Sequence, residues 1–348
     1  MNHKKPGPTI YDVAQTAGVS PATVSRVLNG TGYPVSEQAR ERVLKAAQSL
    51  SYAVKGRLLP SERDVVVMLP NLSNPYYATL LSGIEVSLRM FGLNTLLMNT
   101  KGDIALERQL IAELCRRDPV RLIICPVCDD IRHLQPLICS DTPMIVLEQP
   151  EAGQRSTIVQ NFYKSGELAT AYLLKRGLRR IAFLGAPLNR YSRTQLFEGY
   201  RDTLERAGIL CDPQLVFLSE EDPSLKSEHA LRNDNSPFYM GIQLTDRMIK
   251  KCSVPPQGVV CGNDMAAIGV LHRLQQLGIQ VPSQISVIGC DNIYSAEVSQ
   301  PPLTTIDQRT YELGSMAVDI LYGSMMDPAR KHVNAVLEPR LVVRGSVV

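Results

Sequence analysis

Short apolar runs separated by stretches of helix length are the feature that most constrains the fold of this 348-residue chain. The first four runs are VVVML at 65–69, TLLM at 95–98, LIIC at 122–125 and MIVL at 144–147. Between the first two runs, Leu80, Ile84 and Leu88 recur at the spacing of one helix face, which indicates βαβ units and a parallel sheet. A second series follows at 181–184, 216–218, 258–261 and 286–289. The pattern predicts a two-lobed α/β body built from tandem doubly wound parallel sheets.

The composition is that of an ordinary folded protein in a reducing compartment. It is 44% hydrophobic and 20% charged, and it contains no run of 18 or more apolar residues. Residues 1–8 have no apolar stretch of signal-peptide length, so we expect a cytoplasmic protein without membrane contact. Cys125 and Cys128 form one CxxC. Because neither a second pair nor a histidine stands at ligand spacing, we expect no metal and no cofactor.

Positive charge is concentrated near the N-terminus. Residues 1–60 carry eight Lys or Arg and three Asp or Glu, a net charge of +5, whereas the other 288 residues have a net charge of −2. This asymmetry is typical of a basic nucleic-acid module attached to a near-neutral body, although a small solvated basic domain would carry the same charge.

Three short helices are predicted in the first 50 residues. Thr9 and Asp12 have the spacing of a capping box, and Gly18 follows the first helix where a left-handed conformation is needed. Ser20 is a suitable N-cap for the second helix, and Pro21 suits its first position. A third helix is expected after Ser36. The tight spacing of the first two helices is that of a helix-turn-helix.

The second helix has an inner and an outer face. Val24, Val27 and Leu28 are expected to pack inward. The outer face is predicted to carry Pro21, Ala22, Ser25 and Arg26. A helical bundle with no DNA role remains the alternative, but the basic charge favours an all-α DNA-binding head.

Residues 9–52 resemble the DNA-binding head of the lactose-repressor (LacI) family through the motif DVAxxAGVSxxTVSRVLN. The resemblance implies that the second helix lies in the major groove of double-stranded operator DNA. The positions that match base-reading residues are Pro21, Ala22 and Arg26, and an arginine can bond a guanine through two hydrogen bonds. The positions that match phosphate contacts are Thr9, Tyr11, Ser20, Thr23, Ser25 and Asn29.

The segment after the head departs from the family pattern. Family members usually continue with a hinge helix containing Ala-Arg-x-Leu, whose leucine wedges into the minor groove. Here Gly56, Arg57 and Leu59 match that pattern only if two residues are dropped, and Gly56 and Pro60 both oppose a helix. Leu59 is the candidate wedge, and a flexible linker whose leucines pack on the core is the alternative.

Polar side chains follow several of the predicted strands. Asn71, Asn74, Tyr76 and Tyr77 come after the first strand, Glu148 after the fourth, Asn263 and Asp264 after GVVC, and Asp291 and Asn292 after SVIG. Ligands of open α/β sheets bind beyond the carboxyl ends of the strands, so these residues predict a binding cleft between the lobes. Each residue taken singly is more typical of a turn or a helix cap than of a ligand contact, but their clustering favours a ligand site.

The body also resembles the LacI family and periplasmic sugar-binding proteins, through PNLSNPYYATLLSGIE, VVCGNDMAAIGVL and ISVIGCDNIYSAEVSQPPLTTIDQ. The resemblance implies a small-molecule effector, a sugar, sugar acid or nucleoside, held between the lobes. The candidate effector residues are Tyr76, Tyr77, Glu148, Arg193, Asn263, Asp291 and Gln308. Asp291 stands where the family bonds ligand hydroxyls, and a carboxylate suits that role.

Three departures bear on the identity of the effector. Leu196 stands where the family usually has an arginine, so the positive charge would have to come from Arg190 or Arg193. Gln160 replaces a common aspartate. A polar insertion at 219–237 precedes the helix that often supplies an aromatic stacking face, and the chain has no tryptophan.

The resulting organisation is a helix-turn-helix head at 1–54, a hinge at 55–63 and an effector-binding, dimerising body at 64–348. Lobe 1 is assigned 64–160 and 292–322, and lobe 2 is assigned 161–291 and 323–348. Because no leucine heptads follow the final apolar run LVVRGSVV, we expect a homodimer on a pseudo-palindromic operator.

The predicted function is that of a nucleoid-associated transcriptional repressor whose operator affinity changes when the effector binds. One alternative is an enzyme that uses the cleft on a sugar, but no GxSxG, P-loop or HExxH motif is present. A second alternative is a ligand sensor whose DNA binding is weakened by the altered hinge.

Overall fold

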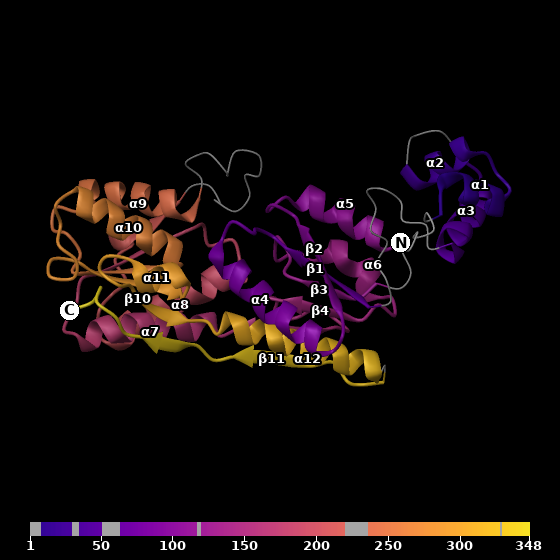
Figure 1. Cartoon of the computed structure of the whole chain (residues 1–348). Helices are drawn as coiled ribbons and strands as arrows, with labels where there is room; N and C mark the ends of the chain where they lie inside the picture. Colours follow the sequence, from indigo (N-terminus) through magenta and orange to yellow (C-terminus); the bar gives the residue numbers. More distant parts are fainter. Residues whose placement is uncertain (1–7, 30–34, 51–62, 117–119, 220–235, 328) are drawn as a thin grey trace, which may run out of the picture. The chain divides into compact units, whose positions relative to one another are not determined.

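The computed structural model describes residues 8–29, 35–50, 63–116, 120–219, 236–327 and 329–348. The chain forms two compact units, Met1–Ser61 and Glu62–Val348 (Figure 1). The first unit contains α1 (Ile10–Ala17), α2 (Pro21–Asn29) and α3 (Glu37–Ser49). None of the described helices is long and apolar enough to cross a membrane.

The head folds as its local signals predict. Thr9 and Asp12 form the capping box, and Gly18 is left-handed at φ 64°. The Ser20 hydroxyl accepts the backbone N–H of Thr23 at 3.1 Å, as an N-cap does. Apolar side chains of all three helices form one small core, made of Val13, Ala14, Ala17, Val24, Val27, Leu28, Val43, Ala46 and Ala47. The predicted helix-turn-helix is therefore confirmed.

The body contains two sheets, as the two series of apolar runs predict, and each sheet has six strands, two more than its series marks. The first has the order β11-β5-β4-β3-β1-β2 and is parallel throughout. Its strands are β1 (Asp64–Leu69), β2 (Asn94–Asn99), β3 (Leu122–Ile124), β4 (Met144–Leu147), β5 (Ser156–Gln160) and β11 (Asn334–Leu337). It is covered by α4 (Pro75–Met90), α5 (Ile104–Leu114), α6 (Gln135–Ile138) and α12 (Thr310–Met326).

The second sheet has the order β12-β10-β9-β8-β6-β7. Its strands are β6 (Ile181–Gly185), β7 (Val216–Leu218), β8 (Gly258–Cys261), β9 (Ser286–Asp291), β10 (Thr304–Asp307) and β12 (Arg340–Val342). Only β12 runs antiparallel to its neighbour among these described strands. The helices of this lobe are α7 (Phe162–Lys175), α8 (Tyr191–Arg206), α9 (Pro237–Lys251), α10 (Asp264–Gln276) and α11 (Tyr294–Val298).

Two assignments of chain segments to lobes are wrong in part. In the segment 292–322, assigned to lobe 1, α12 does pack on α4, but β10 pairs in parallel with β9 in the second sheet. In the segment 323–348, assigned to lobe 2, β12 does join the second sheet, but β11 pairs with β5 in the first sheet. The physical reason is that both sheets end in a strand that can accept an apolar neighbour, so hydrophobicity alone does not select the partner. The chain consequently crosses between the lobes three times, after β5, after β10 and between β11 and β12.

Candidate functional site

The structure places the predicted DNA-reading residues on the outer face of α2. Ala22 and Arg26 are exposed, whereas Pro21 and Ser25 are half-buried. Arg26 is the charged residue of this helix, and Val24 on the opposite face is fully buried. Ala22 and Arg26 therefore lie on the side of α2 that faces away from the core of the head.

The predicted phosphate contacts lie at the start of α1 and along α2. Thr9, Tyr11 and Ser20 are exposed, with 70% of the Tyr11 side chain accessible. Two of these hydroxyls already have local partners, since Thr9 Oγ1 donates to Asp12 at 2.7 Å and Ser20 Oγ lies 2.9 Å from Thr23 Oγ1. The backbone N–H of Thr9 also donates to the Asp12 carboxylate, and this bond, together with that of the Thr9 hydroxyl, lowers the pKa of Asp12. Asn29 ends α2, and Leu59 with the hinge at 55–62 lies outside the described residues.

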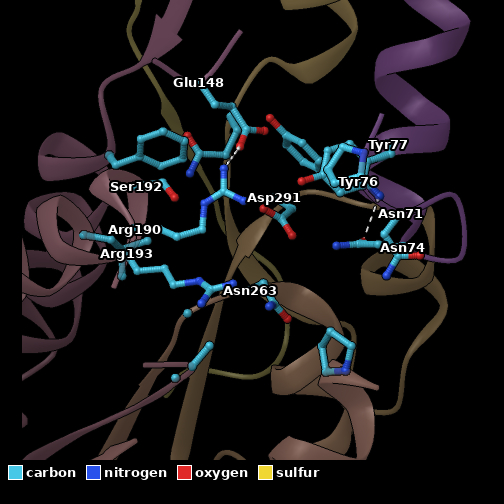
Figure 2. A pocket seen from close by; sticks show the side chains of 18 of the residues that line it. Asn71, Asn74, Tyr76, Tyr77, Glu148, Arg190, Ser192, Arg193, Asn263 and Asp291 are labelled. Carbon is cyan, nitrogen blue, oxygen red and sulfur yellow. Dashed lines mark hydrogen bonds and ion pairs between the residues drawn. The ribbon is translucent and has the colours of Figure 1, made fainter. Parts of the chain in front are cut away.

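One pocket lies between the two lobes of the body, at the carboxyl ends of the strands (Figure 2). It encloses about 1080 Å³ of empty space, part of which is open to solvent. All seven candidate effector residues line it, namely Tyr76, Tyr77, Glu148, Arg193, Asn263, Asp291 and Gln308. Its size and mixed lining are those of a site for a small molecule.

The tyrosine wall is built by the first turn of α4. Asn74 caps this helix by accepting the N–H of Tyr76 at 3.1 Å, which fixes the two rings in an edge-on pair 5.0 Å apart. The Tyr76 hydroxyl accepts a hydrogen bond from Gln160 at 2.5 Å. Burial raises the pKa of both tyrosines well above its ordinary value, and the nearby Glu148 carboxylate raises it further. Both rings therefore present neutral hydroxyls to the pocket.

The opposite wall comes from the ends of β8 and β9. Asn263 caps α10 by accepting the N–H of Ala266 at 2.8 Å. Asp291 has a φ of 134°, a conformation that is strained for a residue with a side chain. Burial, followed by the charges of Asp264 and Glu148, raises the pKa of Asp291 well above its ordinary value. Hydroxyl donors of a ligand would stabilise its ionised form.

Gln308 lines the pocket but its amide is already engaged within the chain. Its Nε2 lies 2.9 Å from the sulfur of Cys290, and its Oε1 accepts a hydrogen bond from Ser165 at 3.2 Å. The side chain is 1% exposed. With its amide engaged in this way, Gln308 is better suited to fixing the segment after β10, where the chain passes from one lobe to the other, than to bonding a ligand.

Arg190 and Ser192 also line the pocket and were not among the selected residues. Figure 2 shows the Arg190 guanidinium below Glu148, with Arg193 reaching toward Asn263. The sequence indicates Arg190 only as a source of positive charge, because Leu196 replaces the usual arginine. Its position five residues after β6, in a loop that returns to the pocket, is the signal that could have identified it.

The two cysteines of the CxxC pair are separate thiols in the described structure. Cys125 is buried and Cys128 is half-buried, and both are free thiols. Burial raises the pKa of both thiols. Within the described ranges, no group of three or more His, Cys, Asp or Glu side chains could hold a metal ion.

Comparison with known proteins assigns the chain to a family. Residues 9–54 match the family described as bacterial regulatory proteins, lacI family, and residues 170–347 match the periplasmic binding protein-like domain. The HTH-type transcriptional repressor PurR of Vibrio atlanticus (strain LGP32) is 31% identical over 348 residues, covering 97% of this chain and 98% of PurR. The chain belongs to the lacI family.

Other relatives agree with this assignment. The ribose operon repressor of Escherichia coli (strain K12) is 32% identical and covers 97% of this chain and 99% of its own length. The solved complex of the transcriptional regulator CelR with cellobiose matches with a TM-score of 0.69 and 25% identity over 97% of this chain and 99% of CelR. This LacI-family protein is accordingly a DNA-binding transcriptional repressor modulated by a small molecule. The enzyme alternative is set aside, because relatives that span nearly the whole chain are repressors.

Proposed function

We propose that this repressor acts as a homodimer, that Arg26 of each copy reads a guanine in one half of a pseudo-palindromic operator, and that a polyhydroxy effector binds between its lobes. The observation that carries the effector part of the proposal is the gathering of all seven candidate residues, from distant parts of the sequence, around one pocket, and the DNA part rests on the exposed position of Arg26 on α2. The ribose and cellobiose named for its relatives support a sugar-like effector. Its place of action would be the bacterial cytoplasm, at the nucleoid.

A second copy of the chain is the proposed occupant of an exposed apolar surface on the first lobe. Val86 and Met90 on α4 are 47% and 81% exposed, and Leu97 on the sheet-edge strand β2 is 41% exposed. Val86 and Met90 lie one turn apart beside the exposed ion pair of Glu85 and Arg89, and exposed apolar side chains of this size are typical of a surface that a partner covers. Sedimentation of Met90→Asp and Leu97→Asp should show monomers where the parent chain sediments as a dimer.

Operator selection tests the DNA part of the proposal. The full chain and the variant Arg26→Ala would each select binding sites from random double-stranded DNA. We expect a palindromic consensus with a guanine in each half-site for the parent chain, and a consensus without that guanine for Arg26→Ala. Failure of the parent chain to enrich any sequence would favour the sensor with weakened DNA binding.

A thermal-shift screen of sugars, sugar acids and nucleosides tests the pocket. A ligand present at 100 times its Kd should stabilise the chain by roughly 2.7 kcal/mol. Asp291→Ala should abolish this shift if Asp291 accepts ligand hydroxyls. As a control, Asp246→Ala removes a carboxylate that pairs with Arg273 on the α9–α10 surface and should leave the ligand shift unchanged.

A further inference from the structure

Arg190 connects the two lobes directly. It is the residue before α8, in the lobe of the second sheet, and its side chain is only 8% exposed despite its charge. Its guanidinium extends to the loops that follow β3 and β4 in the lobe of the first sheet (Figure 2). A buried arginine is stable only where hydrogen-bond acceptors surround it.

The acceptors are all provided by the other lobe. Arg190 Nη1 donates to the carbonyl of Val127 at 2.8 Å, and Nη2 donates to the carbonyl of Pro126 at 3.0 Å. Two carboxylates lie slightly farther away, with Asp129 Oδ1 3.8 Å from Nε and Glu148 Oε2 3.9 Å from Nη2. The planar guanidinium directs two separate nitrogens at these adjacent carbonyls in a fixed geometry, which the single nitrogen of a lysine does not provide.

The next residue strengthens the same connection. The backbone N–H of Tyr191 donates to the Asp129 carboxylate. The other oxygen of that carboxylate accepts a hydrogen bond from Gln149 at 3.3 Å. Two successive residues of one lobe are thus bonded to a single loop of the other.

The receiving loop is fixed within its own lobe. The N–H of Val127 donates to Glu107 at 3.0 Å, and Glu107 is fully buried. The second oxygen of Glu107 lies 2.6 Å from Nε2 of His133. Because these hydrogen bonds fix the loop to the rest of its lobe, the bonds from Arg190 to the loop hold the whole lobe and not the loop alone.

Electrostatics favour a permanent charge on Arg190. Burial alone would lower its pKa, but the facing groups Tyr77, Glu148, Cys125 and Asp129 outweigh burial and raise the pKa above its ordinary value. Removing the guanidinium would leave Glu148 and two buried carbonyls without this partner, which is unfavourable.

We propose that Arg190 is a positioning residue that joins the two lobes across the pocket and so sets the distance between the ligand groups of lobe 1 and those of lobe 2. Tyr76, Tyr77 and Glu148 belong to lobe 1, whereas Asn263 and Asp291 belong to lobe 2. The inference rests on the proposed function only in that the pocket is the effector site.

Hydrogen exchange of the full chain, without DNA or added effector, tests this role. The reporter is the Tyr191 amide, whose acceptor Asp129 belongs to the other lobe. We expect Arg190→Gln to speed exchange of this amide by roughly 10- to 100-fold, as for the loss of one or two charge-assisted hydrogen bonds. Arg190→Lys should fall between Arg190→Gln and the parent chain.

Arg201→Gln is the matched control, since this residue of α8 pairs with Asp202 in its own lobe. Its Tyr191 exchange should equal that of the parent chain. Amides of β1 and β6 report whether each lobe stays folded, and if Arg190→Gln does not fold, Arg190→Lys carries the test. Unchanged Tyr191 exchange in a folded Arg190 variant overturns the proposal. Because no ligand is present, this outcome is independent of the thermal-shift screen.

Discussion

Asp264 is fully buried, and its carboxylate holds the turn that presents Asp291 to the pocket. One oxygen accepts the hydroxyl of Thr305, and the other accepts the backbone N–H of Ile293 at 3.0 Å. The turn contains two strained residues, Asp291 at φ 134° and Asn292 at φ 60°. Strained backbone of this kind persists only where its surroundings hold it, and the hydrogen bonds of Asp264 do so.

We expect Asp264 to make the stability of the body depend on pH. Burial raises its pKa from 3.8 to about 6 in the folded chain. The stabilisation is therefore complete below pH 3.8 and is lost as the pH rises through 6, about 1 kcal/mol of it between pH 5 and 7.5. Asp264→Asn, which cannot ionise, should show a smaller loss over that range. Denaturation by urea followed by circular dichroism measures this, and parallel pH profiles for the two proteins would contradict it.

The pocket residues that lie at the carboxyl ends of strands could be predicted from the sequence. Asp291 and Asn263 directly follow apolar runs, so their place at the sheet edge follows from the parallel topology. The role of Arg190 was not predictable, because its hydrogen-bond acceptors are backbone carbonyls 63 and 64 residues earlier in the chain. A carbonyl has no signature in the sequence, and its position depends on how the lobes meet.

Glycines determine how closely the paired helices of the body approach. A Cβ atom on Gly199 of α8 would lie 2.0 Å from the carbonyl of Tyr163 on α7, and one on Gly166 of α7 would lie 2.0 Å from the carbonyl of Leu196. Gly83 of α4 meets the carbonyl of Tyr311 at the start of α12 in the same way, at 2.1 Å. Figure 1 shows α4 and α12 side by side, although they are far apart in the sequence.

Gly199→Ala should therefore destabilise the body by about 3 kcal/mol, because α7 and α8 must separate to admit one methyl group. Gly208→Ala is the comparison: its φ is +72° and no atom lies within 4 Å of the added Cβ, so only the backbone conformation opposes it. That cost is about 1 kcal/mol. Urea denaturation of both variants measures the difference. Equal losses would show that the close helix contact contributes little.

At the level of helices and strands, the apolar runs predict β1 to β4 and β6 to β9, but they do not mark β5, β10 or β11, and they do not decide which lobe the last elements join. The runs at 304–307 and 334–337 are each short and β-compatible. Their partners, β9 and β5, belong to different sheets. The choice depends on the path of α12 between them, which packs on α4 in the first lobe, and this path is a tertiary property.

The charge distribution of the whole molecule indicates that affinity for DNA and specificity for the operator have different sources. The basic N-terminal 60 residues carry the net charge of +5, so most of the binding free energy on DNA should come from phosphates and fall steeply with salt. Arg26 is expected to contribute to base reading in addition. Lys45 of α3, which is 76% exposed and pairs with Glu41 at 2.9 Å, carries the same charge without a predicted base contact.

Affinity for the selected operator and for random DNA, measured at several salt concentrations, distinguishes these contributions. Arg26→Ala should lower the ratio of operator to random-DNA affinity by roughly 10- to 100-fold, the value of one bidentate base contact. Lys45→Ala should leave that ratio unchanged, because any loss of phosphate attraction weakens both DNAs alike. If Arg26→Ala weakened both DNAs by the same factor, Arg26 would contact phosphates, and base recognition by α2 would depend on Pro21 and Ala22 alone.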